Sequence, residues 1–332
     1  METKIFTDQV EDIKEAAEII SDGGLVAFPT ETVYGLGADA LNAEAVGKVY
    51  AAKGRPSDNP MIVHIWNGTQ LSYLTDEVTE DMKTLMKTFW PGPMTMVVRR
   101  KPIVPDVTTG GLDTVGVRCP SNKVARNLIR FARTPIAAPS ANLSGKPSPT
   151  TAQHCIDDLT GRVDAIIVSE PCQFGIESTV VDMTGDTPMI LRPGMVTKEM
   201  MEYVLKKEVF LDPTLLKRPD LFNNEDFKPK APGMKYKHYA PDAEMVIFQG
   251  DKFKVKKEIE RVKAEAEAQG KKVGVIIFED EKEAAREFFA KLREYDKEGM
   301  DLILAAALDE QGVGFSVMNR MFKSAGYNIK EI

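Results

Sequence analysis

Residues 28–37 read Phe28-Pro29-Thr30-Glu31-Thr32-Val33-Tyr34-Gly35-Leu36-Gly37, and they predict a buried strand that ends in a turn rich in hydroxyls and glycine. Such a turn exposes backbone N–H groups and small donors, which an anionic or amino-acid ligand requires. A second segment, Lys53-Gly54-Arg55-Pro56, begins 16 residues after Gly37. A helix of the intervening length would return this segment beside the first and place two cations next to the hydroxyls.

Length and composition indicate a globular chain of two domains. The chain has 332 residues, of which 43% are hydrophobic and 28% are charged, and this is an ordinary balance for a soluble protein. The net charge of -7 and the pI of about 5.3 argue against a nonspecific nucleic-acid binder, although a local basic cleft remains open.

The cysteines and the apolar segments exclude several further classes. Cys119, Cys155 and Cys172 form no CxxC pair, so a disulfide framework and a Cys-rich zinc site are not expected, and we expect buried thiols. No apolar stretch reaches the roughly 18 residues that a membrane span needs. The N-terminus lacks the apolar region of a signal peptide, and a cytoplasmic location is expected.

The first two thirds of the chain carry more predicted strands than helices, with connections of varied length. This is typical of a mixed α/β or α+β domain and not of a regular βαβ series. The predicted helices are 10–21, a helix that Asn42 caps and that ends near Lys53, 80–89 and 122–131, and the predicted strands are 25–28, 61–65, 94–99, 114–118, 136–138, 165–168, 179–182 and 189–191.

The composition changes after residue 209, which divides the chain into 1–209, 210–243 and 244–332. Residues 210–243 are rich in proline and lack periodicity, which predicts a long linker. Strands and helices alternate again in 244–332, which predicts a small domain with a parallel sheet. Its predicted strands are 245–248, 272–278 and 302–306, and its predicted helices are 255–268, 281–295 and one near 316–325.

Lys53 and Arg55 are the candidate phosphate clamp, because the chain has no Walker A motif and no GxGxxG after a strand. An arginine offers a bidentate fork and a lysine a mobile point charge. The alternative is a pair of solvated cations at a helix C-terminus, which the helix dipole favours. Asn59 follows in the same loop and is part of the candidate site.

Arg118 and His64 end or occupy predicted strands. An arginine at a strand end can bind a carboxylate through two N–H groups, whereas a surface ion pair is the alternative. A single histidine is more often structural than functional. Three segments would add small polar groups or a cation at strand ends, where a cleft would form: 139–145, 174–181 and 190–194.

These residues together resemble a known family. Lys53-x-Arg55 followed by Ser140-x-Asn142 resembles the KxR…SxN signature of the YrdC-type threonylcarbamoyl-AMP synthases. The segments PTETVYGLG, KGRPSDNP, PSANLSG, ESTVVD and LRPG are also similar to that family, over about residues 8–205. Residues 231–241 and the tail 314–325 resemble the longer, two-domain Sua-type form.

The resemblance implies a twisted, mostly open α/β sheet with a concave basic face, followed by a smaller Rossmann-like C-terminal domain. It implies an enzyme that uses L-threonine, bicarbonate or CO2, and ATP with Mg²⁺. The products would be pyrophosphate and threonylcarbamoyl-AMP, the latter for a downstream threonylcarbamoyl transferase in the t⁶A modification of tRNA. No protein ligand for the metal is predicted, because ATP phosphates would hold Mg²⁺.

The resemblance also implies roles for individual residues. Lys53, Arg55, Ser140 and Asn142 would be catalytic. Arg118 would bind the threonine carboxylate, and Thr32, His64, Ser178 and the backbone of Ala138 its amine and hydroxyl. The ATP-binding set would be Lys53, Arg55, Asn59, Ser140, Asn142 and Arg192 at the triphosphate, Thr114 and Ser148 near the nucleotide, and Tyr236 of the linker.

The linker and two rival functions stay open at this stage. Tyr236, His238 and Tyr239 could close over the cleft and exclude water, or the linker could be a passive tether. An RNA-binding module is the first rival, which the acidic charge disfavours. A carbamoyltransferase-type domain is the second, which the lack of zinc-finger cysteines and of an acylphosphatase segment disfavours. Direct contact with tRNA and the oligomeric state are open.

Overall fold

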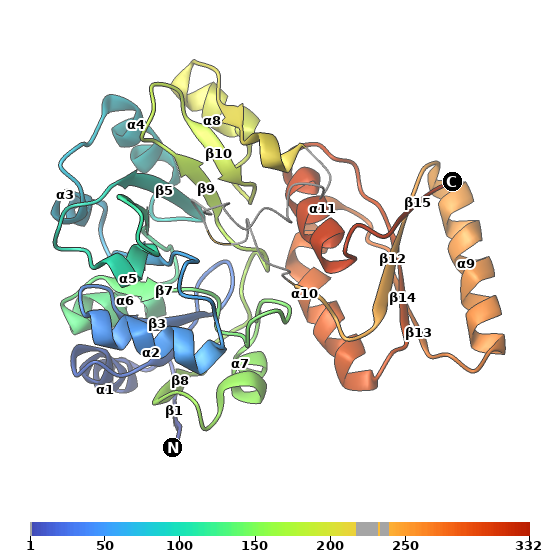
Figure 1. The fold of residues 1–332 in the computed structure, drawn as a ribbon, viewed down its shortest axis with the longest axis horizontal. Coiled ribbons are helices and arrows are strands. Elements are labelled where there is room, and N and C mark those ends of the chain that lie inside the picture. The colour runs from blue at the N-terminus through green and yellow to red at the C-terminus, as the bar shows by residue number, and fades with distance from the viewer. Residues whose placement is uncertain (1, 217–231, 233–238) are drawn as a thin grey trace. The chain divides into compact units, whose positions relative to one another are not determined.

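The computed structural model describes residues 2–216, 232 and 239–332, which form two compact units (Figure 1). The first unit contains residues 1–144 and 148–235, and the second contains 145–147 and 236–332. Tyr236 and His238 of the predicted lid lie outside the described residues. No helix in the described parts is long and apolar enough to cross a membrane.

The first unit is built on a mixed sheet of eleven strands. Five strand pairs are parallel and five are antiparallel, which confirms the predicted mixed α/β class. In spatial order the strands are β1 (Lys4–Phe6), β8 (Ala165–Ile167), β2 (Val26–Phe28), β3 (Gly35–Asp39), β7 (Ile136–Ala138), β4 (Ile62–His64), β6 (Thr114–Arg118), β5 (Met94–Arg99), β9 (Thr179–Asp182), β10 (Met189–Arg192) and β11 (Phe210–Leu211).

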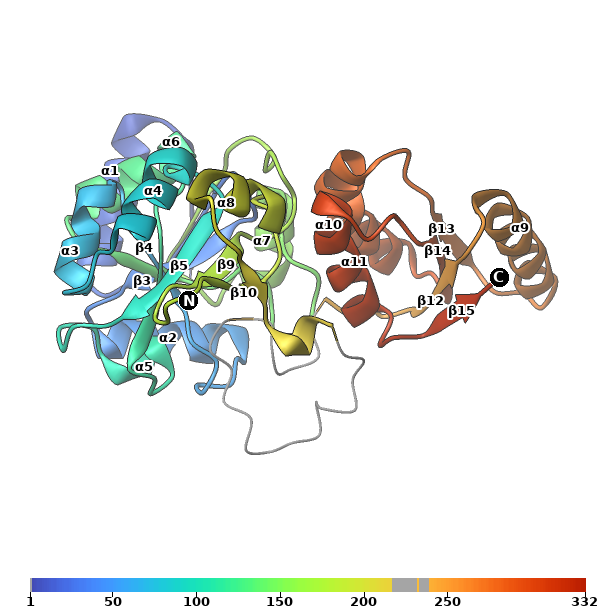
Figure 2. The same ribbon diagram turned by 90° about the horizontal axis from the view of Figure 1, so that it is seen from above.

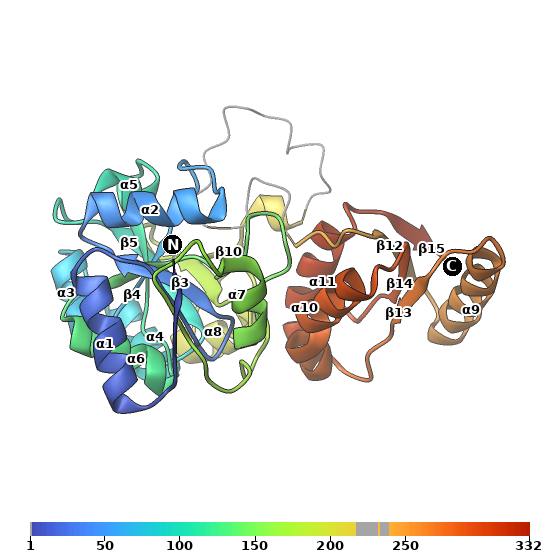
Figure 3. The same cartoon turned by 90° about the horizontal axis from the view of Figure 1, so that it is seen from below.

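Both faces of the first half of this sheet are covered by helices. α1 (Val10–Ser21) and α6 (Lys123–Ala132) pair on one face, and α2 (Ala43–Lys53) and α5 (Asp106–Thr109) lie on the other (Figures 2 and 3). Strand β2 is therefore apolar throughout: Val26 and Phe28 belong to one core, and Ala27 between them belongs to the other. The other helices are α3 (Leu71–Leu74), α4 (Glu80–Phe89), α7 (Ala152–Leu159) and α8 (Lys198–Leu205), with short 3₁₀ turns at Gly68–Gln70 and Pro213–Leu215.

Strand β3 corrects the interpretation of the opening segment. The hydroxyl-rich turn ends at Tyr34, and Gly35–Asp39 continue as a strand antiparallel to β2. A Cβ on Gly37 would lie 2.8 Å from the Phe28 ring and 2.7 Å from Ile136 Cγ2. The glycine therefore serves close packing between strands rather than a turn. Strands β1 and β11 and helices α7 and α8 were also not predicted.

The second unit contains a parallel sheet, as predicted, but the sheet has four strands and its edge strand at Ile329–Glu331 was not predicted. The strand order is β13 (Val273–Ile276), β14 (Leu302–Ala306), β12 (Glu244–Gln249) and β15 (Ile329–Glu331). Helices α10 (Glu281–Glu298) and α11 (Gly312–Ser324) pack together on one face, whereas α9 (Lys252–Ala268) lies on the other (Figure 1). Tyr239, the predicted lid residue that is described, is buried with its ring 5.0 Å from that of Phe289.

Candidate active site

The two halves of the KxR and SxN pattern lie side by side. Lys53 is the last residue of α2, and its ammonium donates to the backbone carbonyls of Ser140, at 2.5 Å, and of Asn142. The amide of Ser144 donates back to the Lys53 carbonyl at 3.0 Å. Lys53 is only 3% exposed, so the alternative of a solvated cation is wrong for this residue. Its charge instead orders the loop after β7 that carries Ser140 and Asn142.

The Arg55 side chain forms hydrogen bonds within its own loop. Its Nη2 donates to the carbonyls of Asn59 at 3.3 Å and Pro60 at 3.0 Å, and the guanidinium remains partly exposed. Asn59 is buried, and its Oδ1 has no hydrogen-bond partner in the described part of the chain. The loop thus presents a partly exposed cation and, in the described part of the chain, a buried amide oxygen without a hydrogen-bond partner.

Four neighbouring strands bring three of the predicted threonine-binding residues, His64, Arg118 and Ser178, into one row. His64 at the end of β4 is in register with Arg118 at the end of β6, and Arg118 is in register with Thr95 of β5. Thr95 Oγ1 lies 2.8 Å from Ser178 Oγ, just before β9. The ends of β4 and β6 and the starts of β5 and β9 therefore gather side chains that are far apart in the sequence.

Arg118 is paired in the interior with an acid that was not predicted as a site residue. Its Nη2 lies 2.9 Å from Glu31 Oε1, and the two side chains are 4% and 3% exposed. Arg118 Nε and Glu31 Oε2 have no hydrogen-bond partner among the described residues. The alternative of a surface ion pair is therefore wrong. A buried pair in which each partner keeps an unused polar atom can receive a ligand that carries both a carboxylate and an amine.

The turn in front of this pair is held by its own hydroxyls. Thr30 Oγ1 donates to the Val33 carbonyl at 2.6 Å and lies 2.9 Å from Thr32 Oγ1. Arg118 Nη2 reaches Thr30 Oγ1 at 3.5 Å. Thr32 is fully buried, so its hydroxyl faces the interior of the site and not bulk water. The backbone of the turn is also bonded to the polar loops, because Phe174 N donates to the Glu31 carbonyl at 2.9 Å.

His64 is neutral at physiological pH. Burial first, and then the charge of Arg118, lower its pKa from 6.5 to about 3. Its Nδ1 lies 3.1 Å from the Ile62 carbonyl, which fixes the ring, and Phe28 packs edge-on against it. A neutral imidazole beside Arg118 can accept or donate a hydrogen bond to a ligand without adding a second positive charge.

Arg192 connects the Ser178 loop to the end of β10. Its Nε donates to the Ser178 carbonyl at 3.1 Å and its Nη2 to the Ser178 hydroxyl at 3.2 Å. Gly194 makes this arrangement possible, because a Cβ there would lie 2.4 Å from the backbone N of Thr179. Two of the three polar segments, 174–181 and 190–194, are thus in direct contact.

The remaining predicted residues are placed less closely together. Ser148 donates to Glu177 Oε1 at 2.6 Å, which ties the SxN loop to the ESTVVD segment. Ala138 is the last residue of β7 and pairs with Ile62. Thr114 begins β6 and lies at the far end of the strand from Arg118, roughly 13 Å away at the usual rise per residue. The structure does not join Thr114 to the row that contains Arg118.

The thiols are not candidates for a nucleophile. All three cysteines are free and buried, as expected. Burial raises the pKa of Cys119 to about 11 and that of Cys172 to about 12, so both stay protonated near pH 7. Among the described residues no group of three or more His, Cys, Asp or Glu side chains could hold a metal ion.

The fold and the site define a class of protein: a mixed α/β protein with a buried arginine–glutamate pair, with a lysine at the end of α2 and with an arginine in the loop that follows. Residues 18–194 match the family model described as telomere recombination, which covers the Sua5, YciO and YrdC proteins. Residues 196–326 match the model described as the C-terminal domain of threonylcarbamoyl-AMP synthase.

Relatives of known activity match over nearly the whole chain. The threonylcarbamoyl-AMP synthase of Pyrococcus abyssi is 45% identical over 96% of both chains, and that of Bacillus subtilis is 43% identical over 95% of this chain and 93% of its own. The solved structure of P. abyssi Sua5 in complex with L-threonine is 44% identical, covers 100% of both chains and has a TM-score of 0.93. The chain therefore belongs to the threonylcarbamoyl-AMP synthase family, in its two-domain form.

Proposed function

We propose that this chain condenses L-threonine, bicarbonate or CO2, and ATP into threonylcarbamoyl-AMP, with the threonine at Arg118 and the triphosphate at the Lys53, Arg55 and Ser140 loops. The full-length similarity to synthases supports the reaction. The observation that carries the placement is the buried ion pair of Arg118 and Glu31, whose unused Nε and Oε2 match the two charges of an amino acid.

Threonine would bind as a zwitterion. Its carboxylate would accept from Arg118, and its ammonium would donate to Glu31 Oε2, which otherwise lacks a partner. The amine must lose a proton before it captures CO2 to form a carbamate, and the Glu31 carboxylate is the acceptor that the geometry offers. Thr32, His64, Ser178 and the Ala138 carbonyl would fix the hydroxyl and the amine.

The nucleotide would occupy the cationic end of the site. Arg55, Ser140, Asn142, Arg192 and the charge of Lys53 would stabilise the triphosphate, with Asn59, Thr114, Ser148 and Tyr236 completing the predicted set. The carbamate oxygen then attacks the α-phosphate in line, and the cations neutralise the leaving pyrophosphate. This reaction requires positioning and electrostatics but no covalent nucleophile, which agrees with protonated, buried thiols.

Mg²⁺ is part of this proposal as a partner of the nucleotide. It would neutralise phosphate charge and would take most of its ligands from phosphates and water. Asn59 is the residue that could add a protein oxygen, because its buried Oδ1 has no hydrogen-bond partner in the described residues.

The product would serve a downstream threonylcarbamoyl transferase in the t⁶A modification of tRNA. Because the reaction uses ATP and its product is used to modify tRNA, we expect the protein to act in the cytoplasm. The direct test is incubation of the protein with labelled threonine, bicarbonate and ATP, followed by a search for an AMP-linked product. ATP–pyrophosphate exchange that needs both threonine and bicarbonate would exclude a module that only binds RNA. Product formed from carbamoyl phosphate without bicarbonate would instead favour the carbamoyltransferase-type alternative.

Arg55 provides the test of the nucleotide end. The Arg55→Ala variant removes the partly exposed guanidinium but leaves the buried Lys53 contacts in place. We expect ATP affinity and turnover to fall at least tenfold, because charge-assisted hydrogen bonds to phosphate are lost. A folded variant with unchanged ATP affinity and rate would remove Arg55 from the site. Arg133→Ala, which replaces another exposed arginine at a helix end, is the control.

A further inference from the structure

The second unit has a topology that creates a crevice. The chain passes from β12 through α9 to β13, returns through α10 to β14, and crosses through α11 to β15. The neighbouring strands β12 and β14 therefore send their following helices to opposite faces of the sheet (Figure 1). In open parallel sheets, ligands bind outside the carboxyl ends of such a strand pair.

A cavity of about 390 Å³ lies at this place. Its walls come from the ends of three strands and the loops that follow them, at 248–256, 277–281 and 306–311. The volume is within the range of roughly 300–1,000 Å³ that is usual for small-molecule sites. Every residue that lines the cavity belongs to the second unit, and none of them is among the residues assigned to threonine or ATP.

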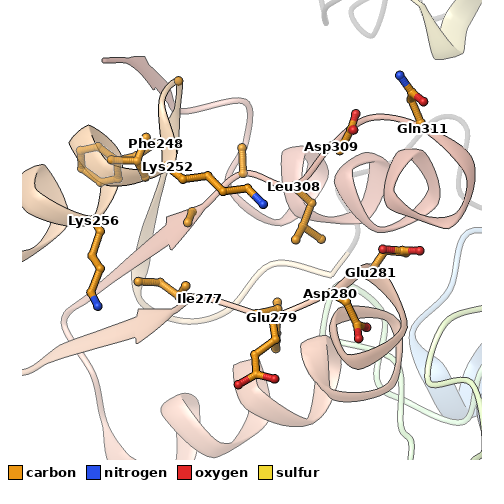
Figure 4. Close-up of a pocket in the computed structure, with 15 residues that line it drawn as sticks. Phe248, Lys252, Lys256, Ile277, Glu279, Asp280, Glu281, Leu308, Asp309 and Gln311 are labelled. Carbon is orange, nitrogen blue, oxygen red and sulfur yellow. The ribbon is translucent and has the colours of Figure 1, made fainter.

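The charges on the cavity walls are separated by sign. Lys252 and Lys256 occupy the first turns of α9, and Lys252 reaches toward the middle of the cavity (Figure 4). Glu279, Glu281 and Asp309 lie across from it (Figure 4). No hydrogen bond or ion pair of either lysine ammonium is seen in the described parts of the chain, whereas Arg261 and Lys263 further along α9 pair with acids of the same helix.

The floor between the two charged walls is apolar. Phe248, Leu308 and Ala306 line it, and Ile277 contributes an apolar side chain that is 48% exposed. An exposed apolar wall between fixed charges of opposite sign is suited to a flat apolar ring that carries polar groups at both ends.

We propose that this cavity binds a nucleoside monophosphate. The phosphate would lie between Lys252 and Lys256, the base would pack on Ile277 and Leu308, and an exocyclic amino group of the base would donate to Glu279 or Glu281. The ribose would span the distance between the lysines and the apolar floor. One phosphate group matches two lysines, whereas the carboxylates on the walls, Asp280 included, would repel a triphosphate. The site is distinct from the catalytic one and does not depend on the proposed reaction.

Hydrogen exchange of the full chain, measured by mass spectrometry with AMP as the probe, tests the proposal because it shows which segments the ligand protects. We expect slower exchange in 277–283 and 306–313, and at least tenfold weaker protection by adenosine, which lacks the phosphate. The double variant Lys252→Ala/Lys256→Ala should lose the AMP effect. Lys254→Ala/Lys257→Ala, on the same helix but outside the cavity wall, should keep it.

Each other outcome overturns the proposal. Absence of protection, or protection that survives in Lys252→Ala/Lys256→Ala, would show that AMP does not occupy this cavity. Equal effects of adenosine and AMP would remove the phosphate from recognition, and stronger effects of ATP would contradict the role of the acidic wall. Protection by L-threonine instead of AMP would assign the cavity to an amino acid. None of these results bears on catalysis by the first unit, which the product assay tests separately.

Discussion

At the scale of single residues, the interior of the site is dominated by charges that the fold has not fully neutralised. Arg118 and Glu31 are both nearly inaccessible to water, and a buried ion pair gains little net stability over apolar residues of the same size. Retention of such a pair beside Thr30 and Thr32 is better explained by a ligand than by folding. Glu31 had a sequence signal, as the lone carboxylate in the hydroxyl-rich turn, but its partner could not be inferred without the fold.

Arg118→Lys tests the recognition of threonine. Lysine keeps a positive charge for Glu31, so the fold should survive, but it loses the planar fork that grips a carboxylate. We expect the KM for threonine to rise roughly tenfold or more and the KM for ATP to change less than about twofold. Arg118→Ala should act in the same direction with a larger effect, at an added cost of about 3–5 kcal/mol for the unpaired Glu31. Steady-state kinetics with each substrate varied decides the matter: equal increases in both KM values would indicate a structural or phosphate-binding role.

His64 gives a prediction about stability and pH. Its pKa is about 3 in the folded chain and 6.5 when exposed, so below pH 6.5 the unfolded chain binds a proton that the folded chain does not. The contribution of neutral His64 to the free energy of unfolding is therefore complete above pH 6.5 and is lost as the pH falls toward 3. Between pH 7 and pH 5 the wild type should lose about 2 kcal/mol more than His64→Gln.

Denaturant unfolding followed by tryptophan fluorescence measures the stability of the first unit, which contains His64. Trp66 and Trp90 are the only tryptophans of the chain, and both lie in this unit. His154→Gln, at a half-buried position on α7, is the matched control. Parallel stability curves for the wild type and His64→Gln would show that His64 is protonated in the folded state.

At the scale of elements, sequence patterns predicted most helices and strands, and they failed where tertiary contacts replace local preference. α4, β5, β6, β7, β9 and β14 have the predicted bounds. The signals are clearest for α4, which has a Thr79 cap and Pro91 after it, and for β7, which lies between Pro135 and Pro139. β3 was missed because Gly35 and Gly37 have low intrinsic strand preference. Only the Phe28 ring and Ile136, which approach from neighbouring strands, make glycine the residue that fits.

The contacts among the predicted site residues could be inferred from the sequence only in part. Lys53 and the Ser140 loop were expected to be neighbours, and they are. The orientation of Lys53 was not predictable, because its ammonium turns to backbone carbonyls rather than outward. The register of β4, β6 and β5, which aligns His64, Arg118 and Thr95, depends on strand order, and no local pattern encodes strand order.

Gly194→Ala tests whether close approach of two segments positions Ser178 and Arg192. An added Cβ would lie 2.4 Å from Thr179 N and 2.8 Å from the Glu177 carbonyl oxygen, and backbone atoms cannot move aside cheaply. We expect a loss of about 1–3 kcal/mol in stability and a fall in activity of at least tenfold. Gly185→Ala is the control, because its nearest neighbour would be 4.0 Å away. If both variants behave like the wild type in unfolding and turnover, the contact at Gly194 does not position the loop.

At the scale of the whole molecule, each unit has buried clusters of its own among the described residues. The buried clusters around β2 and β7 contain residues of the first unit alone, and the cluster around Phe248 and Leu304 contains residues of the second unit alone. A ligand stabilises only the cooperative unit that binds it, by an amount set by its concentration relative to its Kd. From the change in composition after residue 209, the sequence predicts a division into 1–209, 210–243 and 244–332, with regular alternation of strands and helices only in the last part.

Selective stabilisation of the units by their ligands follows from these separate buried clusters. Threonine together with a non-hydrolysable ATP analogue, each at about 100 times its Kd, should stabilise the first unit by at least 2.7 kcal/mol. The tryptophan transition reports only the first unit and should move to higher denaturant, whereas far-UV circular dichroism reports both units and should show a second transition that stays in place. AMP should move that second transition, and Lys252→Ala/Lys256→Ala should abolish its effect while preserving the response to threonine and the ATP analogue. A single transition that moves as a whole with either ligand would contradict the prediction, because it would show that the two units unfold together. The hydrogen-exchange experiment would then be the measurement that shows which unit binds which ligand.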